Sequence, residues 1–253
     1  MAQPDQLTIL AVHAHPDDES SKGAGTVARY TDDGARAVLV CCTGGEEGDV
    51  LNPAMDLPEV KENIERVRRE ELAKAADIIG YNQVHYLGYR DSGMPDSQAN
   101  AHPDSFAAAP LEEAVERLVR LIRDERPHVI VTYPDDQQGY QHPHHLRVHE
   151  ITAPAWHAAG DATAFPEAGD PWLPQKLYYT TWSRARVDAL HALYGELELE
   201  SPYTDEWFKR PSQDHRITTR IEVAAWYQRR SDALLAHATQ VDPASKFWFG
   251  LPP

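Results

Sequence analysis

The sequence predicts an α/β fold in which helices cover both faces of a mostly parallel β-sheet. Two observations support this prediction. Short apolar runs alternate with longer segments of helical periodicity over the first 160 residues, and polar clusters follow the first and fourth of these runs directly. A chain of 253 residues can also bury one large core. We therefore expect residues 1–253 to form a single domain with a three-layer, Rossmann-like fold and an irregular C-terminal third.

The first half of the chain supplies four predicted strands, at residues 7–13, 37–42, 83–87 and 128–133. Runs of four to eight apolar and β-branched residues are typical of buried strands. Helices are predicted between them at 21–34, 58–79 and 111–124, where apolar residues recur at intervals of three and four. Gly34 and Gly80 stand where a left-handed residue commonly ends a helix. No glycine-rich phosphate loop follows the first strand, so no nucleotide site is predicted.

Beyond residue 142 the pattern is less regular. A helix is expected to begin at His145 and to end or kink near Ala153, because Pro154 cannot donate to the helical hydrogen-bond ladder. Residues 160–176 are expected to form a loop, 176–182 a strand, 183–194 a helix, 216–223 a strand and 224–237 a helix. The aromatic tail Phe247-Trp248-Phe249 is interpreted as a packing anchor or subunit contact rather than as a ligand site.

Composition excludes several classes of partner. Asp and Glu number 40 against 24 Lys and Arg, so there is no basic surface that would bind nucleic acid. No apolar run approaches the roughly 20 residues of a membrane span, and the first residues show no secretory signal. Cys41 and Cys42 are adjacent on a predicted buried strand, a spacing that fits neither a zinc ribbon nor a redox pair. These features predict a cytoplasmic protein that does not bind nucleic acid, and they leave open whether it forms a homo-oligomer.

The first polar cluster is His13-Ala14-His15-Pro16-Asp17-Asp18-Glu19, reached directly from an apolar run. It therefore leaves the carboxyl end of a strand, where open α/β sheets bind ligands. Pro16 stiffens the turn, so that His15 and Asp18 can converge while Asp17 faces elsewhere. An imidazole and two carboxylates arranged in this way suit a hydrolytic zinc ion and its general base.

A third metal ligand is available in Tyr140-Gln141-His142-Pro143-His144-His145, which also follows an apolar run. Catalytic zinc usually takes three protein ligands and leaves one position open. The alternative is that both clusters are ordinary polar loops, since the chain has 13 histidines. Two histidine–proline clusters at two strand ends make that alternative the weaker one.

These residues resemble a known family. The Ala-His-Pro-Asp-Asp-Glu segment and the later His-Pro-x-His segment are similar to the signature pair of the PIG-L/LmbE superfamily of zinc-dependent N-deacetylases and amidases. The similarity is greatest to its mycothiol branch. It extends over about 240 residues and includes Ser21-Lys22-Gly23, Thr43-Gly44-Gly45-Glu46-Glu47-Gly48, Asn52-Pro53-Ala54-Met55-Asp56, Arg90-Asp91-Ser92-Gly93-Met94 and Ala236-His237-Ala238-Thr239-Gln240.

The resemblance implies a role for each matching residue. It implies that one Zn²⁺ per chain, with Fe²⁺ as the alternative, is bound by His15, Asp18 and His145. Asp17 matches the general base, His142 a residue that stabilises the oxyanion or protonates the leaving amine, and Tyr140 a tyrosine that polarises the carbonyl. Residues matched to substrate binding are Lys22, Glu47, Arg68 and Asp91. The implied reaction is hydrolysis of an amide on the amine of a glucosaminyl-inositol, with a pseudodisaccharide thiol conjugate as substrate.

Other histidines are expected to surround the site. His149 follows His145 by one helical turn and is interpreted as a supporting or core residue. His237 is either a charge partner for a helix C-terminus or, by the resemblance, part of the rim of the site.

Position 144 departs from the family pattern, because the usual His-Pro-Asp-His reads His-Pro-His-His here. We expect the missing carboxylate to have tuned His142, so that His144→Asp would raise activity at neutral pH. Two alternatives remain at this stage. One is an N-acetyl deacetylase of the same branch, and the other is a binding protein that has lost activity through His144.

Overall fold

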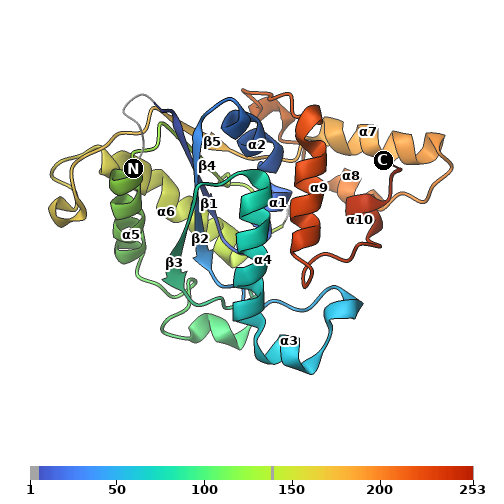
Figure 1. Ribbon diagram of the computed structural model, residues 1–253, viewed down its shortest axis with the longest axis horizontal. Coiled ribbons are helices and arrows are strands. Elements are labelled where there is room, and N and C mark those ends of the chain that lie inside the picture. Colours follow the sequence, from blue (N-terminus) through green and yellow to red (C-terminus); the bar gives the residue numbers. More distant parts are fainter. Residues whose placement is uncertain (1–5, 138–139, 253) are drawn as a thin grey trace.

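A five-stranded parallel sheet forms the centre of the molecule (Figure 1). The computed structural model describes residues 6–137 and 140–252; the first five residues, which enter the prediction about a secretory signal, lie outside them. The strands are β1 (Thr8–His13), β2 (Arg36–Thr43), β3 (Gln83–Tyr89), β4 (Val129–Thr132) and β5 (Lys176–Tyr179). Their order is β3-β2-β1-β4-β5, and every neighbouring pair is parallel. The predicted parallel sheet is confirmed.

Helices cover both faces of this sheet (Figure 1). One face packs against α2 (Ala24–Asp32), α4 (Ile64–Ile79) and α9 (Tyr227–Ala236). The other face packs against α5 (Leu111–Glu125) and α6 (Pro143–Ala159). The predicted three-layer arrangement is therefore confirmed, and the central strands are buried on both sides. That burial explains why their sequences are continuous apolar runs rather than alternating ones.

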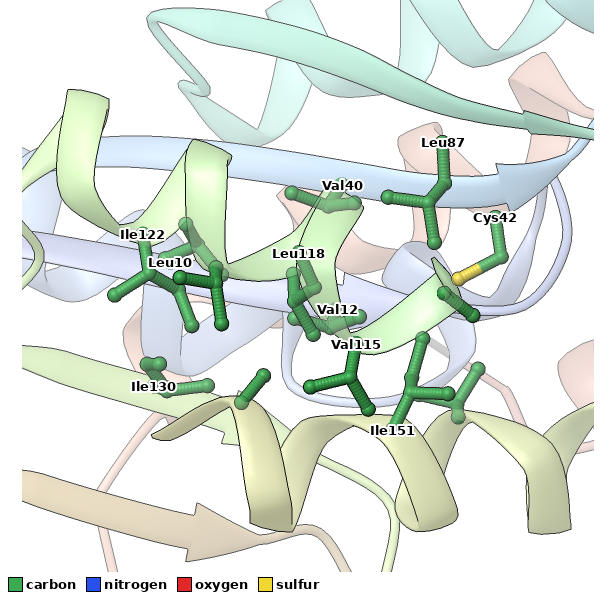
Figure 2. Packing of buried hydrophobic residues seen from close by; sticks show 14 of the residues in the cluster. Leu10, Val12, Val40, Cys42, Leu87, Val115, Leu118, Ile122, Ile130 and Ile151 are labelled. Carbon is green, nitrogen blue, oxygen red and sulfur yellow. The ribbon is translucent and has the colours of Figure 1, made fainter. Parts of the chain in front are cut away.

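The larger core lies between β1, β2 and the pair α5 and α6. Leu10 and Val12 of β1 are fully buried against Leu118 and Ile122 of α5 (Figure 2). Successive residues of a strand point to opposite faces, so the two cysteines of β2 serve different layers. Cys42 packs in this core and Cys41 in the one beneath α4. Both thiols are free and buried, and burial raises the pKa of each, in agreement with the predicted packing role.

Two predicted helices have different bounds in the structure. The segment predicted as 21–34 forms α2, which begins after Gly23 in a left-handed conformation, and a separate short helix, α1 (Asp18–Ser21), precedes it. The segment predicted as 58–79 forms α3 (Pro58–Glu62) and α4, because Asn63 leaves the helical conformation. Gly80 ends α4 with a positive φ angle, as its position in the sequence predicted.

The helix α6 continues past Pro154, so of the two alternatives that the sequence suggested, an end or a kink near Ala153, the end is wrong. Proline inside a helix costs about 3 kcal/mol through the lost hydrogen bond and a steric clash. Here the helix continues to Ala159 because Ile151, Ala155 and Ala159 are fully buried against the core under α5. Tertiary packing outweighs the local preference of the proline.

The C-terminal third is irregular, as expected. Its helices are α7 (Arg184–Glu196), α8 (Asp205–Lys209), α9 and α10 (Lys246–Phe249). The predicted strand 216–223 is wrong. Its apolar residues alternate as in a strand, but the described residues offer it no pairing partner, and most of its positions are exposed. The predicted helix 224–237 is a single 3₁₀ turn, Ala224–Trp226, followed by α9.

Short 3₁₀ turns complete the described chain, at Pro53–Met55, Gln98–Ala101, Pro166–Ala168 and Asp214–Arg216. None of the helices in the described part of the chain is long and apolar enough to cross a membrane.

Candidate active site

The two polar clusters meet where the strand order of the sheet reverses. The segment after β1 begins at Ala14, and the N-terminus of α6 follows β4, the neighbour of β1 in the sheet. Parallel strands end at the same edge of the sheet, and the crevice between such neighbours is the usual ligand site of open α/β folds. Residues about 130 positions apart in the sequence are therefore brought into contact.

His15, Asp18 and His145 converge as the sequence predicted. The Asp18 carboxylate lies between the two rings, with its Oδ2 3.3 Å from Nδ1 of His15 and its Oδ1 3.4 Å from Nε2 of His145. Ligand atoms on a tetrahedral zinc ion, about 2.0–2.1 Å from the metal, are themselves about 3.3 Å apart. The separations and the donor types of this trio, all on nearly buried residues, fit such an ion.

The protonation states of the trio also suit a cation. Burial alone would raise the pKa of Asp18, but the Lys22 ammonium 2.6 Å away and the His145 ring hold it well below its ordinary value. Burial lowers the pKa of His145 to about 4, against the opposing charge of Asp18. For His15, burial is outweighed by its hydrogen bond to Asp18, so its pKa is raised. A cation that binds here would therefore have to displace a proton that Asp18 helps His15 to hold, whereas the His145 ring is already neutral at neutral pH.

A second group of three side chains, His15, His142 and His144, has ligand atoms equally close together. It shares His15 with the first group. The group with Asp18 is the one that pairs a charged oxygen ligand with two imidazoles, a donor set typical of hydrolytic zinc sites.

Asp17 lies beside this trio in an unusual backbone conformation. Its φ is 119°, a value that non-glycine residues rarely adopt. Burial and the neighbouring Asp18 raise the pKa of Asp17 to about 6, although the Arg68 guanidinium 3.1 Å away opposes this. A carboxylate with a pKa near the working pH is suited to accept and return a proton.

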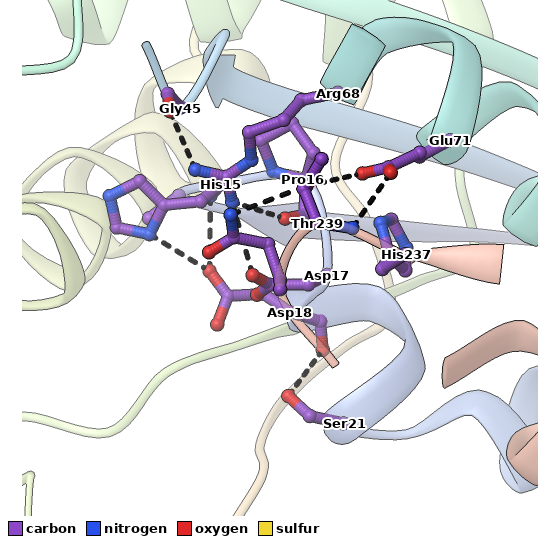
Figure 3. Close-up of polar contacts among 12 residues, drawn as sticks. His15, Pro16, Asp17, Asp18, Ser21, Gly45, Arg68, Glu71, His237 and Thr239 are labelled. Carbon is purple, nitrogen blue, oxygen red and sulfur yellow. Dashed lines mark hydrogen bonds and ion pairs between the residues drawn. The ribbon is translucent and has the colours of Figure 1, made fainter. Parts of the chain in front are cut away.

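Arg68, expected to bind substrate, is 3% exposed and braces the turn that carries Asp17. Its terminal amino groups donate to the carbonyls of Gly45 and Pro16, 2.6 Å from each, and to Asp17 (Figure 3). A Cβ at Gly45 or Gly48 would collide with this guanidinium, which explains these two glycines of the Thr43–Gly48 segment. These contacts indicate that Arg68 holds the Asp17 side chain and its turn in place.

Sequence reasoning missed Glu19, which holds the other side of the same turn. The carboxylate of Glu19 accepts a hydrogen bond from the backbone N–H of Asp17 at 3.0 Å and pairs with Nε2 of His237 at 2.7 Å. Both side chains are fully buried. Burial opposes their charges, but each partner overcomes it, so the pKa of Glu19 is lowered and that of His237 is raised. His237 is therefore neither a rim residue nor a simple helix-end charge.

A second missed residue, Glu71, fixes the segment that follows His237. Its carboxylate accepts hydrogen bonds from the backbone N–H and the hydroxyl of Thr239, at 2.9 and 2.7 Å (Figure 3). Glu71 lies one helical turn after Arg68 on the inward face of α4, where the pattern predicts apolar residues. A charged residue at an inward position of the predicted helix was the available signal for Glu71.

His142 caps the N-terminus of α6 through its ring. Its Nδ1 accepts a hydrogen bond from the backbone N–H of His144 at 3.2 Å. Burial and the nearby rings of His15 and His145 lower its pKa to about 2. The ring is therefore neutral, and because Nδ1 is an acceptor, the proton is on Nε2. His142 is suited to donate a hydrogen bond from Nε2 rather than to carry a full positive charge.

The other expected catalytic residue, Tyr140, lies 5.5 Å from the His145 ring, measured between ring centroids, and is 48% exposed. Burial and the charge of Asp18 raise its pKa to about 12. The phenol keeps its proton and can serve as a hydrogen-bond donor.

His144 does not tune His142 in the way expected from the sequence. Its Nδ1 lies 2.9 Å from Nε2 of His15 and 3.2 Å from Oδ1 of Asp91, and its Nε2 lies 2.8 Å from the hydroxyl of Ser92. Asp91, expected to bind substrate, thus supplies a carboxylate behind the proposed ligand His15. Burial would raise the pKa of Asp91, but His144 and His15 hold it well below the ordinary value. The departure at position 144 is accommodated by a complete set of polar partners.

The remaining predicted residues have clear positions. Lys22 pairs with Asp18, and Glu47 pairs with Arg90 at 2.5 Å. His149 lies outside the trio, with Nδ1 3.1 Å from the carbonyl of Tyr133, which agrees with a supporting role.

A cavity of about 620 Å³ opens over the trio. This volume lies within the range of about 300–1,000 Å³ that is common for small-molecule sites. The predicted catalytic, metal-binding and substrate-binding residues all contribute to its lining. The three supporting histidines, His144, His149 and His237, are outside the described lining.

Comparison with known proteins gives consistent results. The family model described as PIG-L: GlcNAc-PI de-N-acetylase matches residues 10–156. A mycothiol S-conjugate amidase of Streptomyces coelicolor is 44% identical, over 98% of this chain and 87% of that protein. A 1D-myo-inositol 2-acetamido-2-deoxy-alpha-D-glucopyranoside deacetylase of Rhodococcus erythropolis is 40% identical, over 93% of this chain and 82% of that protein.

Solved structures show the same fold at low sequence identity. The N,N'-diacetylchitobiose deacetylase of Pyrococcus horikoshii aligns with a TM-score of 0.68 and 16% identity, covering 97% of this chain and 75% of that one. GalB, the 4-carboxy-2-hydroxymuconate hydratase of Pseudomonas putida, aligns with a TM-score of 0.62 and 18% identity, covering 93% and 80%. A deacetylase and a hydratase share this architecture, so the reaction must be argued from the site.

Proposed function

The chain belongs to the PIG-L family of deacetylases and amidases, and we propose that it is a zinc-dependent hydrolase that cleaves an amide on the amine of a glucosaminyl-inositol. The convergence of His15, Asp18 and His145 beside the raised-pKa carboxyl of Asp17 carries this proposal. The relative with 44% identity is named as an S-conjugate amidase. We therefore propose that the acyl group removed is a thiol-conjugated cysteinyl group rather than acetate.

His15, Asp18 and His145 would hold the metal. When bound there, a zinc ion supplies a Lewis acid and lowers the pKa of water to about 7. Two features of this chain support that occupancy, namely the ligand separations of 3.3 and 3.4 Å and the neutral state of His145.

Asp17 would accept a proton at its Oδ atoms from the attacking water. Its raised pKa, about 6, allows the same carboxyl to return that proton to the departing amine. Arg68 and Glu19 keep its backbone and side chain in place from opposite sides. The base is therefore pre-organised before substrate binds.

Charge that develops on the carbonyl oxygen would be met by hydrogen-bond donors of the chain. His142 carries its proton on Nε2, and Tyr140 keeps its phenolic proton. Fixed donors aimed at a developing oxyanion stabilise the transition state more than the ground state. Because His142 stays neutral, the proton for the leaving amine is assigned to Asp17.

The test compares two substrates that share the glucosaminyl-inositol part. One carries an acetyl group on the amine and the other an S-methyl-N-acetylcysteinyl group. We expect metal-loaded protein to cleave the second with the higher kcat/KM. A preference for the acetyl compound would assign the chain to the deacetylase reaction named for the relative with 40% identity. Absence of cleavage of both, with one metal bound per chain, would contradict the proposed reaction.

Metal identity needs a separate measurement. Protein stripped with a chelator is reconstituted with Zn²⁺ or Fe²⁺, and metal content and activity are measured together. We expect about one ion per chain with either metal. Activity that is independent of both would remove the metal from the proposal.

A further inference from the structure

The cavity over the trio of His15, Asp18 and His145 is also lined by aromatic side chains from the C-terminal third. Trp182 follows β5, Trp207 belongs to α8, and Phe247 and Trp248 belong to α10. In Figure 1 the helices α7, α8 and α10 gather beside α9, away from α5 and α6. The tail that the sequence suggested was a packing anchor therefore also forms part of the wall of the candidate active site.

The rings of this aromatic wall (Trp182, Trp207, Phe247 and Trp248) are ordered against one another. Trp182 stacks on Phe247 with ring centroids 5.6 Å apart and planes 11° from parallel, and on Trp207 at 6.4 Å and 23°. Trp248 meets Trp182 edge-on at 6.1 Å. All four are only half-buried within the chain. Rigid aromatic side chains lose little conformational entropy when they bind a ligand, and they prefer flat apolar partners.

Positive charges surround the aromatic wall. The guanidinium of Arg186 lies 4.7 Å from the Trp182 ring centroid, and that of Arg210 lies 4.2 Å from the Trp207 centroid. In these cation–π contacts, arginines of the protein already occupy positions where the rings would attract a cation. A positively charged ligand would meet repulsion here, whereas a neutral or anionic aromatic group would not.

The order of the strands places Trp182, and with it the rings that stack on Trp182, on one flank of the trio His15, Asp18 and His145. Glu47, which the resemblance matches to substrate binding, follows β2 on one side of the trio. Trp182 follows β5 on the other side. A substrate whose sugar contacts the first side presents its acyl group to the second.

We propose that the aromatic wall is a subsite for a flat, uncharged or anionic aromatic substituent on the acyl group of the substrate. This inference rests on the proposed amidase function and adds the chemical class of the group that the enzyme selects. Conjugates with an aromatic S-substituent should be cleaved with a higher kcat/KM than S-methyl conjugates. A cationic aromatic substituent should lose that advantage.

The experiment uses metal-loaded, full-length protein and three conjugates that differ only in the S-substituent: methyl, naphthylmethyl, and a trimethylammonium-bearing naphthylmethyl. Wild type is compared with Trp207→Leu, Trp207→Phe and Phe247→Leu. Trp226→Leu is the matched control, because Trp226 is a tryptophan outside the cavity lining, bonded to Asp32. We expect Trp207→Leu to lower the naphthylmethyl-to-methyl ratio of kcat/KM about 10-fold, an amount typical of one lost ring contact. Trp207→Phe should retain most of the ratio, and Trp226→Leu all of it.

Two outcomes would overturn the inference while the amidase function stands. One is a naphthylmethyl-to-methyl ratio of kcat/KM that is unchanged in Trp207→Leu and Phe247→Leu. The other is an equal loss for all conjugates, which would mean that the rings support the fold or stack on the sugar. If wild type cleaves no conjugate, the proposed function fails, and calorimetric binding of S-naphthylmethyl-N-acetylcysteine to wild type and Trp207→Leu still decides the subsite. Equal affinity in the two proteins would reject it.

Discussion

Replacing Asp17 by asparagine should lower activity and raise stability at the same time. The pKa of this carboxyl rises from 3.8 to about 6 in the folded protein, mainly through burial and then through Asp18. A rise of that size corresponds to about 3 kcal/mol of lost stability once the group is ionised. Because 28% of the side chain is exposed, solvent screening reduces the effect, and we expect a gain of about 1–2 kcal/mol in Asp17→Asn.

The sign of the pH dependence follows from the raised pKa. Below about pH 3.8 the carboxyl is protonated in both the folded and unfolded states, and wild type loses no stability through it. The penalty grows as pH rises from 3.8 through 6 and is complete above that. The advantage of the asparagine variant should therefore be full at pH 7.5 and much smaller at pH 4.5.

Urea unfolding of chelator-treated protein at these two pH values measures the stability difference. Turnover of the metal-loaded variant should fall by about 10²–10⁴, the usual contribution of a general base. A variant that is less stable than wild type at pH 7.5, or equally stabilised at both pH values, would refute the electrostatic reasoning. Retained turnover would remove Asp17 from the reaction.

Four further outcomes are expected. His145→Ala should lose bound metal, as measured by elemental analysis after dialysis. The control His149→Ala, one helical turn away and outside the trio, should retain the metal. Equal metal content in the two variants would contradict the ligand assignment. Glu19→Gln should lower the free energy of unfolding by about 1–3 kcal/mol, because the fully buried His237 loses the carboxylate with which its Nε2 pairs. The Glu19–His237 pair should contribute less stability in wild type as pH rises above 6.5, because the pKa of His237 is raised. It should also contribute less as pH falls below 4.5, because the pKa of Glu19 is lowered. An unfolding free energy that is flat across both pH ranges would contradict this. His144→Asp should lower turnover rather than raise it. A carboxylate at position 144 would stand beside Asp91 in a fully buried position, and the hydrogen bond to Ser92 would be lost. Higher turnover at matched metal content would support the interpretation made from the sequence instead.

The sequence by itself determined the parallel sheet and the two clusters at its edge. Continuous apolar runs such as Leu7–Val12 specify strands buried on both faces, and a strand end followed by His15-Pro16-Asp17-Asp18 specifies a stiff polar turn at the sheet edge. These are local properties, because burial and backbone preference act on neighbouring residues. The positions of α5 and of the first four strands followed for the same reason.

Only the tertiary structure decided how distant polar residues pair. The burial of Glu19 against His237, and the bond from His144 to His15 and Asp91, join residues that are 129 to 218 positions apart or lie on different elements. No periodicity encodes such contacts, since each depends on which helix packs on which strand. The same holds for Pro154, which packing keeps inside α6, and for residues 216–223, whose strand-like alternation finds no partner in the described residues. Trp182 joins the candidate site because the end of β5 lies beside that of β4, and chain topology, rather than local composition, sets that neighbour.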